Sequence, residues 1–191
     1  MSRNQVRIIG GAWRSRIIRF PPKKPLRPTP DRVRETVFNW LGQDLTGRSC
    51  LDLFAGSGAL GFEAASRGAR RVVMVEGDRE CCKALAASRN ELAATSVELK
   101  CADALEFLRS GEERYDIIFI DPPFRASFAP RLLSLLPRNM APGALVYLES
   151  AGEPEVSAGW EVLKQGRAGQ VRFQLLKRTE HEQQSGVPGN V

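Results

Sequence analysis

Short apolar runs alternate with segments of helical spacing along most of the chain. From residue 49 onward, the runs with β-strand character are 50–54, 71–76, 97–100, 115–120 and 144–148. The segments between them repeat apolar residues at helical spacing, for example over residues 84–92. The runs 71–76 and 115–120 are almost continuously apolar, which is typical of strands covered on both faces. The alternation predicts an α/β fold, a parallel sheet with helices on both faces.

Two further strand-like runs near the C-terminus, 160–164 and 170–176, are separated only by residues 165–169. So short a link suits an antiparallel hairpin and cannot hold a crossover between parallel strands. We therefore expect seven strands in a mostly parallel sheet that is closed by an antiparallel C-terminal hairpin.

The N-terminal region has a pattern of its own. Residues 5–9 and 16–20 flank the turn-like sequence Gly10-Gly11-Ala12-Trp13 and predict a small β-hairpin. A proline-rich link over 21–28 follows. Next, Thr29-Pro30-Asp31 resembles a helix start, with Thr29 as the N-cap and Pro30 in the first turn.

The helix that follows is expected to be amphipathic and to end near residue 41. Its apolar residues, which should be buried, are Val33, Val37, Phe38 and Leu41. Its polar residues, expected on the opposite side, include Arg32, Arg34 and Asn39. The chain thus divides into a hairpin and first helix (1–41), one principal sheet domain (42–178) and a tail expected to be disordered (179–191).

The length of 191 residues allows a sizeable core. A domain of this size buries roughly 70% of the surface of its unfolded chain, so the core should need neither disulfides nor metal. No apolar run approaches the roughly 20 residues of a membrane helix, and the first residues lack the apolar stretch of a signal peptide. We therefore expect a cytoplasmic protein.

The net charge of +6 is concentrated at one end of the chain. Residues 1–41 hold ten Lys or Arg and two acidic residues, a balance of +8, so the remainder carries −2. A cationic segment on a nearly neutral body is typical of a polyanion partner, usually nucleic acid. The arginines expected to contact RNA phosphates are Arg14, Arg16, Arg19, Arg32 and Arg34. The alternative is a solvated leader that binds nothing.

Residue types that bind metals or act as nucleophiles are few. The cysteines Cys50, Cys81, Cys82 and Cys101 form no C-x-x-C pair, and the single histidine, His181, lies in the polar tail. We therefore expect neither a zinc site nor catalysis by imidazole. Cys50 and Cys101 lie beside strand-like runs and are expected in the core.

A glycine motif follows the first strand-like run of the sheet. The sequence Gly56-Ser57-Gly58-Ala59-Leu60-Gly61 opens a helix, which is the context in which G-x-G-x-x-G indicates a nucleotide-type ligand. Glu76 stands twenty residues after Gly56, at the end of the second run, where an acid accepts hydrogen bonds from ribose hydroxyls. These two features fit a nicotinamide cofactor about as well as S-adenosylmethionine.

Two acids favour S-adenosylmethionine. Asp52 lies four residues before Gly56 and can reach through the glycine loop to the cationic methionine end of that cofactor, whereas it would repel a pyrophosphate. Asp103 follows the third run, where it can accept from the adenine amine or cap the next helix. The expected cofactor site comprises Asp52, Phe54, Gly56, Ser57, Gly58, Glu76, Asp103 and Ala104.

The sequence Asp121-Pro122-Pro123-Phe124 comes directly after the apolar run 115–120. In an open α/β sheet this is the carboxyl edge, where ligands bind. The exocyclic amine of a purine is a poor nucleophile because its lone pair is delocalised into the ring. The Asp121 carboxylate and the Pro122 carbonyl can accept both amine protons, while Phe124 offers a face for stacking. We expect Asp121, Pro122 and Phe124 to be catalytic.

Three stretches together resemble one family. They are residues 26–41, which begin Leu-Arg-Pro-Thr-Pro-Asp, residues 51–64 around the glycine motif, and Asp121–Phe124. Over about residues 5–177 the chain is similar to the bacterial 16S ribosomal RNA guanine-N2 methyltransferases. That resemblance implies a Rossmann-like class I methyltransferase fold with an N-terminal hairpin. It also implies methyl transfer from S-adenosylmethionine to a guanosine of the small subunit, with a partly or fully assembled subunit as the preferred substrate.

The resemblance has one departure and leaves alternatives. Ser15 stands where similar proteins often have the glycine of Arg-Gly-Arg. The motif 121–124 does not choose between purines, so an adenine-N6 methyltransferase is the alternative. A nicotinamide-dependent oxidoreductase would explain the glycine loop and Glu76 but not the motif 121–124. A non-catalytic RNA-binding protein would explain only the basic region.

Overall fold

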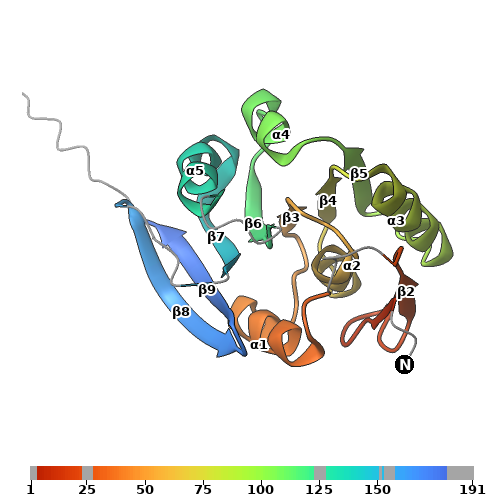
Figure 1. Cartoon of the computed structure of the whole chain (residues 1–191). Coiled ribbons are helices and arrows are strands. Elements are labelled where there is room, and N and C mark those ends of the chain that lie inside the picture. The colour runs from red at the N-terminus through yellow and green to blue at the C-terminus, as the bar shows by residue number, and fades with distance from the viewer. Residues whose placement is uncertain (1–3, 23–27, 123–127, 151, 153–157, 180–191) are drawn as a thin grey trace, which may run out of the picture.

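The computed structural model describes residues 4–22, 28–122, 128–150, 152 and 158–179. Two sheets are present (Figure 1). The small one pairs β1 (Gln5–Arg7) with β2 (Ile17–Arg19) in antiparallel register, which confirms the predicted hairpin. The large one has seven strands in the order β5-β4-β3-β6-β7-β9-β8.

The five central strands run parallel and form the frame of the site. They are β3 (Ser49–Asp52), β4 (Arg71–Glu76), β5 (Val97–Cys101), β6 (Tyr115–Ile120) and β7 (Met140–Ser150). β9 (Val171–Arg178) is antiparallel to both β7 and β8 (Trp160–Ala168). The predicted mostly parallel sheet with an antiparallel C-terminal hairpin is confirmed.

Helices cover both faces of this sheet (Figure 1). They are α1 (Asp31–Leu41), α2 (Ala59–Ser66), α3 (Arg79–Glu91), α4 (Ala104–Ser110), α5 (Phe128–Leu135) and a 3-10 turn, η1 (Leu136–Asn139). Successive strand residues alternate between two buried clusters, so Cys50 belongs to the cluster of α1–α3 and Leu51 to that of α4 and α5. The double burial explains why the strand sequences are continuously apolar. None of the described helices is long and apolar enough to cross a membrane.

The N-terminal hairpin packs on the sheet domain as part of its core. Val6, Ile8, Ile18 and Phe20 are buried in the same cluster as α1 and α2. The hairpin turn is fixed to the end of α2, because the Ala12 amide donates to the Ser66 carbonyl over 2.7 Å. Gly11 has φ +72°, and a Cβ there would lie 1.8 Å from that carbonyl oxygen, so the contact requires glycine.

Ser15 closes the same hairpin with φ 71°, in the left-handed region. Glycine adopts this conformation without the steric cost that a serine incurs. The departure at Ser15 therefore leaves the turn intact and places a strained residue in it.

Helix α1 corrects two predictions. Its N-cap is Pro30, and no side chain caps it, so Thr29 is not the cap. Arg34 was expected on the exposed face but is completely buried beside Val33, Val37 and Phe38. Its charge is balanced inside the protein, and it is therefore not available to RNA phosphates.

Candidate active site at the carboxyl edge of the sheet

The glycine loop connects β3 to α2 and encloses Asp52. The Asp52 side chain is 2% exposed, and its Oδ2 accepts a hydrogen bond from the Gly61 amide at 2.9 Å. Burial, the main cause, and the charge of Glu76 raise the pKa of Asp52 from 3.8 to about 7, against the lowering effect of backbone hydrogen bonds. Gly58 has φ +82°, and a Cβ there would meet Leu85 and Phe62 at 2.7 Å. The loop therefore brings bare backbone to the carboxyl edge.

Two other predicted residues of this loop support it from within. Ser57 is buried, and its Oγ accepts from the Ala59 amide at 3.4 Å. Phe54 is partly buried against the cluster of α4 and α5. Both lie at the edge where the sequence predicted a ligand.

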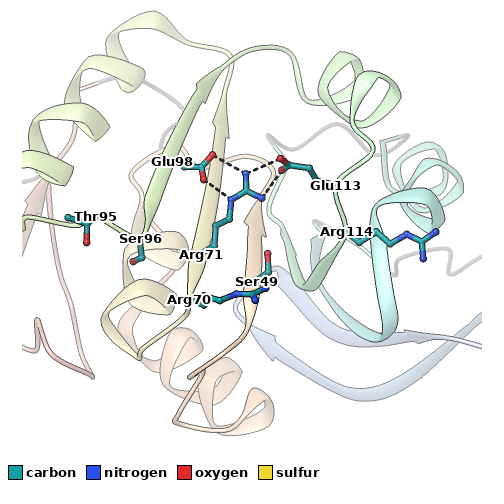
Figure 2. A pocket seen from close by; sticks show the side chains of 8 residues that line it. All are labelled: Ser49, Arg70, Arg71, Thr95, Ser96, Glu98, Glu113 and Arg114. Carbon is teal, nitrogen blue, oxygen red and sulfur yellow. Dashed lines mark hydrogen bonds and ion pairs between the residues drawn. The ribbon is translucent and has the colours of Figure 1, made fainter.

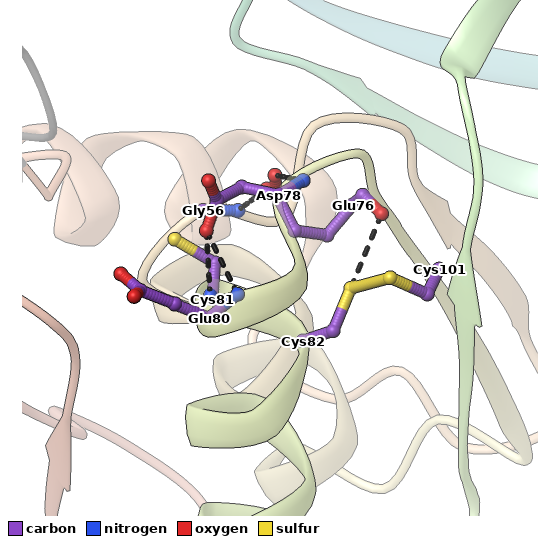
Figure 3. The surroundings of a disulfide bond; sticks show 7 residues. All are labelled: Gly56, Glu76, Asp78, Glu80, Cys81, Cys82 and Cys101. Atoms are coloured by element: carbon purple, nitrogen blue, oxygen red, sulfur yellow. Dashed lines mark hydrogen bonds between the residues drawn. A yellow bond between two sulfur atoms is a disulfide. The ribbon is translucent and has the colours of Figure 1, made fainter.

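Glu76 lies at the end of β4 and joins two turns. Its Oε2 accepts from the Gly56 amide at 2.7 Å, and its Oε1 accepts from the Asp78 amide at 2.8 Å (Figure 3). A carboxylate has about four acceptor positions, so each oxygen can take one more hydrogen bond. Glu76 can therefore bind ribose hydroxyls while its backbone partners hold it in place.

Asp103 caps helix α4, as one of its two predicted roles required. Its Oδ1 accepts from the amides of Leu105 and Glu106 at 2.9 and 3.0 Å. Both cap bonds use the same oxygen, so Oδ2 of this exposed residue can still accept from a ligand amine. Ala104, the first residue of α4, is buried beneath it.

The cysteines near this edge differ from the prediction. Cys50 is buried as expected, but Cys101 is exposed and forms a disulfide with Cys82 of α3 (Figure 3). The Cys82 sulfur lies 3.3 Å from the carbonyl oxygen of Glu76. The expectation that Cys101 is a core residue was wrong, because β5 is the outermost strand on that side of the sheet.

Asp121 directly follows β6, next to the end of β7. Ile120 pairs with Leu148 in the parallel register, so the next residues, Asp121 and Glu149, are neighbours at the strand ends. The Thr29 hydroxyl donates to Asp121 Oδ2 over 3.4 Å, and the Tyr147 hydroxyl donates to Glu149 Oε1 over 2.7 Å. Sequence reasoning had placed Asp121 at this edge but not Thr29, Tyr147 or Glu149.

The electrostatics of this group are those of carboxyls kept from water. Burial first, and then the charges of Glu149 and Asp52, raise the pKa of Asp121 well above its usual value. Burial also raises the pKa of Glu149, against the lowering effect of the hydroxyls of Tyr147 and Thr29. Pro122 follows Asp121 and is partly exposed at the edge. Phe124, the third predicted catalytic residue, lies outside the described residues.

Buried Arg34 holds the segment that carries Thr29. Its guanidinium pairs with Glu63 Oε2 at 3.0 Å and Asp31 Oδ1 at 2.6 Å. It also donates to the carbonyls of Arg7 at 2.8 Å and Thr29 at 3.2 Å. Arg34 thereby ties the hairpin, α1 and α2 together at the approach to Asp121, which is a structural role and not the predicted contact with RNA.

The other predicted RNA-contacting arginines, Arg14, Arg16, Arg19 and Arg32, are exposed. Arg16 donates to the carbonyl of Glu91 at 3.2 Å, and Arg19 pairs with the Glu91 carboxylate at 3.9 Å. Glu91 is the last residue of α3, and α3 begins at the carboxyl edge. These hairpin arginines therefore lie toward the far end of that helix, whereas Arg32 lies in the first turn of α1, close to Thr29.

A cavity of about 450 Å³ lies at the opposite, amino edge of the sheet (Figure 2). Its central side chain is Arg71, which pairs with Glu98 at 2.6 Å and with Glu113 at 2.8 Å. Both carboxylates that line this cavity are thus engaged by Arg71. It contains none of the residues that the sequence analysis singled out.

Comparisons with known proteins agree with this geometry. The family described as conserved hypothetical protein 95 matches residues 6–177. A protein of Escherichia coli K12 named ribosomal RNA small subunit methyltransferase D is 42% identical over 179 residues, which cover 91% of this chain and 90% of the relative. A Haemophilus influenzae protein of the same name is 37% identical over 184 residues, covering 92% and 95%.

Solved structures have the same architecture. That of the Escherichia coli protein yhhF has a TM-score of 0.83 at 42% identity and covers 93% of this chain and 99% of that one. An RNA methyltransferase of Salinibacter ruber, in complex with S-adenosyl-L-homocysteine, has a TM-score of 0.66 at 19% identity, with 81% and 95% covered. At that identity the likeness concerns the fold alone. The predicted Rossmann-like class I methyltransferase fold is confirmed.

Proposed function

The chain belongs to the family of the ribosomal RNA small subunit methyltransferase D proteins, and we propose that it methylates the N2 amine of a guanosine in 16S ribosomal RNA. The observation that carries this proposal is the position of Asp121 and Pro122. As the two residues that follow β6, they supply a carboxyl group and a backbone carbonyl to the carboxyl edge, which the glycine loop after β3 also borders. Two acceptors at that edge suit an amine that must be methylated.

S-adenosylmethionine fits the other half of the edge as the methyl donor. Glu76 keeps acceptor positions for ribose hydroxyls, and Asp103 Oδ2 can accept from the adenine amine. The backbone of Gly56, Ser57 and Gly58, with Asp52 beneath it, would hold the amino-acid end, and Phe54 and Ala104 would line the site. When bound, this group supplies a methyl carbon that is activated by the adjacent sulfonium.

The residues of this chain prepare the amine and take up its proton. The Asp121 carboxylate and the Pro122 carbonyl each accept a hydrogen bond from the N2 amine, and these two bonds orient the nitrogen lone pair. As the new nitrogen–carbon bond forms, the nitrogen loses one proton, and Asp121 is placed to receive it. Stacking of the base on Phe124 is part of the proposal.

Residues 1–41, without Arg34, would supply phosphate contacts to the RNA outside the catalytic edge, and the sheet domain would carry the chemistry. Beyond this arm, the described chain holds no added recognition module of the kinds that read single strands or duplexes. The target base must also leave its stack, at a cost of a few kcal/mol that is lowest where the base is already splayed out. We therefore propose a partly or fully assembled small subunit as substrate, and with it a cytoplasmic location.

The test is the identity of the methylated nucleoside. The purified chain is incubated with S-adenosylmethionine carrying a labelled methyl group and with small subunits, assembly intermediates or naked 16S RNA that lack the modification. Digestion and mass spectrometry should show N2-methylguanosine, formed fastest on assembled particles. N6-methyladenosine would instead support the adenine alternative, and labelling of neither nucleoside would contradict the proposal.

A further inference from the structure

A partly buried carboxyl, Asp121, and a buried one, Glu149, stand next to each other where β6 and β7 end. Glu149 is 5% exposed and directly follows Leu148, the register partner of Ile120, just as Asp121 follows Ile120. Within the described residues, no Lys or Arg forms an ion pair with either carboxyl. Two close carboxyls without a cation rarely ionise together, because each charge opposes the other.

The Thr29 hydroxyl lies beside both carboxyls. It is 5% exposed, donates to Asp121 over 3.4 Å, and is near enough to Glu149 to lower the pKa of that carboxyl. Its own position is fixed, because the Thr29 carbonyl accepts from buried Arg34 at 3.2 Å. A hydroxyl both donates and accepts, so it can pass a proton from one carboxyl to the other.

Few polar side chains face the two carboxyls, and the only charged one among those described is acidic. Asp52 faces Asp121 from β3, Tyr147 faces Glu149 from β7, and Thr29 faces both from the segment before α1. Among the described residues, no basic group is seen to face the pair. The Tyr147 hydroxyl, which donates to Glu149, anchors the more buried carboxyl, and Asp121 is the more exposed of the two.

We propose that Glu149 is a positioning residue for methyl transfer: Asp121 and Glu149 share one proton across the Thr29 hydroxyl, and arrival of the substrate amine moves it onto Glu149. For this transfer the Thr29 hydroxyl turns from Asp121 toward Glu149, so that its oxygen accepts the Asp121 proton as its own proton passes to Glu149. One proton leaves Asp121 and one arrives at Glu149, so none is gained or lost. The amine then meets an ionised Asp121, the form that can accept its proton. This inference rests on the proposed function for its role in catalysis.

An infrared measurement tests the shared proton without any activity. At neutral pH the wild-type protein should show a protonated-carboxyl band that is lost in Asp121→Asn and in Glu149→Gln. Asp52→Asn identifies the separate band of Asp52. If Glu149→Gln and Asp121→Asn leave the spectrum unchanged, the shared proton does not exist. This readout stands even if the chain methylates a base other than guanine.

The pH dependence of kcat tests the role of Glu149 in turnover. In Glu149→Gln the neighbouring negative charge is gone, so the acidic limb should move down by about one pH unit. The plateau should fall about tenfold, because Asp121 becomes a weaker base. Cofactor affinity, measured by calorimetry, should stay as in the wild type. An unmoved acidic limb with an unchanged plateau would overturn the proposal.

Two variants at Thr29 distinguish the effect of its hydroxyl from the effect of its side-chain shape. Thr29→Val keeps the branched shape and removes the hydroxyl, so kcat should fall about tenfold. Thr29→Ser keeps the hydroxyl and should recover most of the rate. The opposite ranking, with Val active and Ser impaired, would mean that Thr29 only fills space. The pair also decides the matter if Glu149→Gln does not fold, which thermal unfolding would reveal.

Discussion

The two halves of the carboxyl edge are built differently. In the half formed by β4 and β5, acids accept from backbone amides of nearby turns, as Glu76 does from Gly56 and Asp78, and Asp103 from Leu105. In the half formed by β6 and β7, Asp121 takes its hydrogen bond from Thr29, a side chain 92 residues away. Its neighbour Glu149 depends on the hydroxyl of Tyr147.

This difference has consequences for chemistry. Backbone amides are always donors, so they hold an acid in one orientation and leave its remaining oxygen lone pairs to accept from a ligand. Carboxyls that share burial and charge with one another respond instead to pH and to whatever binds beside them. The first half is suited to hold a cofactor in one geometry, and the second to exchange a proton during each turnover.

The largest effect should come from Asp121, the group proposed to contact the target amine. Asp121→Ala should lower kcat by about 10²- to 10³-fold, since it removes one preorganised acceptor. Affinity for S-adenosylmethionine, measured by calorimetry, should remain nearly unchanged, because that half of the edge is intact. Near-normal turnover in this variant would show that Asp121 has no part in the mechanism, and the proposed difference in role between the two halves would be wrong.

Asp52 lies between the two halves, and its burial should make the free energy of unfolding depend on pH. Its pKa in the folded protein is about 7, against 3.8 ordinarily. Between these pH values the unfolded chain releases the Asp52 proton and the folded chain keeps it, so stability from this group falls as pH rises and levels off above about 7. Asp52→Asn cannot ionise and should escape that loss.

The measurement is the free energy of unfolding of both proteins from pH 4 to 8. The difference, variant minus wild type, should grow with pH and then level off, by at most about 4 kcal/mol since one pKa unit is worth about 1.4 kcal/mol. Using the change with pH cancels any constant effect of the substitution itself. A difference that is flat across this range would show that Asp52 ionises normally.

The first half of the edge was largely predictable from the sequence. Glu76 is the last residue of β4, and Asp103 follows the end of β5 by two residues. Their hydrogen-bond partners lie in the next few residues or in the glycine motif. Local rules for strands, glycine turns and helix caps therefore suffice to place them. The mostly parallel sheet of seven strands and the two hairpins followed from similar local patterns.

The second half was only partly predictable because it is assembled from distant segments. A signal for Glu149 was present, since it is the first acid after the apolar run 144–148, just as Asp121 is after 115–120. Recognising the pair required the register of β6 against β7. Arg34 was misplaced for the same reason: its burial is balanced by Glu63, 29 residues away, which no local pattern shows.

A substitution at Glu76 tests the role of the β4 and β5 half of the edge in cofactor binding. Glu76→Ala should weaken S-adenosylmethionine binding by about 10- to 100-fold, since hydrogen bonds to a charged group contribute about 1.5–3 kcal/mol. At saturating cofactor kcat should stay near that of the wild type, because the ribose contact is made equally in ground and transition states. Glu98→Ala, at the amino edge, is the control and should leave both constants unchanged. An unaltered dissociation constant for Glu76→Ala would make it a purely structural acid.

The smallest effect per residue should come from the hairpin arginines, which lie away from both halves. Replacing Arg14, Arg16 and Arg19 by Gln should raise KM for the RNA substrate and leave kcat and cofactor affinity unchanged. Each lost phosphate contact should make the log–log salt dependence of RNA binding shallower by about 0.7 to 0.9. Filter binding over a range of salt concentrations measures that slope.

A control for this triple variant removes the same charge from the face covered by α4 and α5. Its exposed arginines are Arg109, Arg131 and Arg138. If the RNA lies on the hairpin, only the hairpin variant should change the salt slope, since phosphate contacts act over short range whereas net charge acts on both variants alike. Equal changes in both would point to a general electrostatic attraction without a defined path. An unchanged slope in both would mean that the hairpin arginines stay solvated, and that the RNA is held only at the carboxyl edge, where Arg32 is the nearest of the basic residues predicted to bind it.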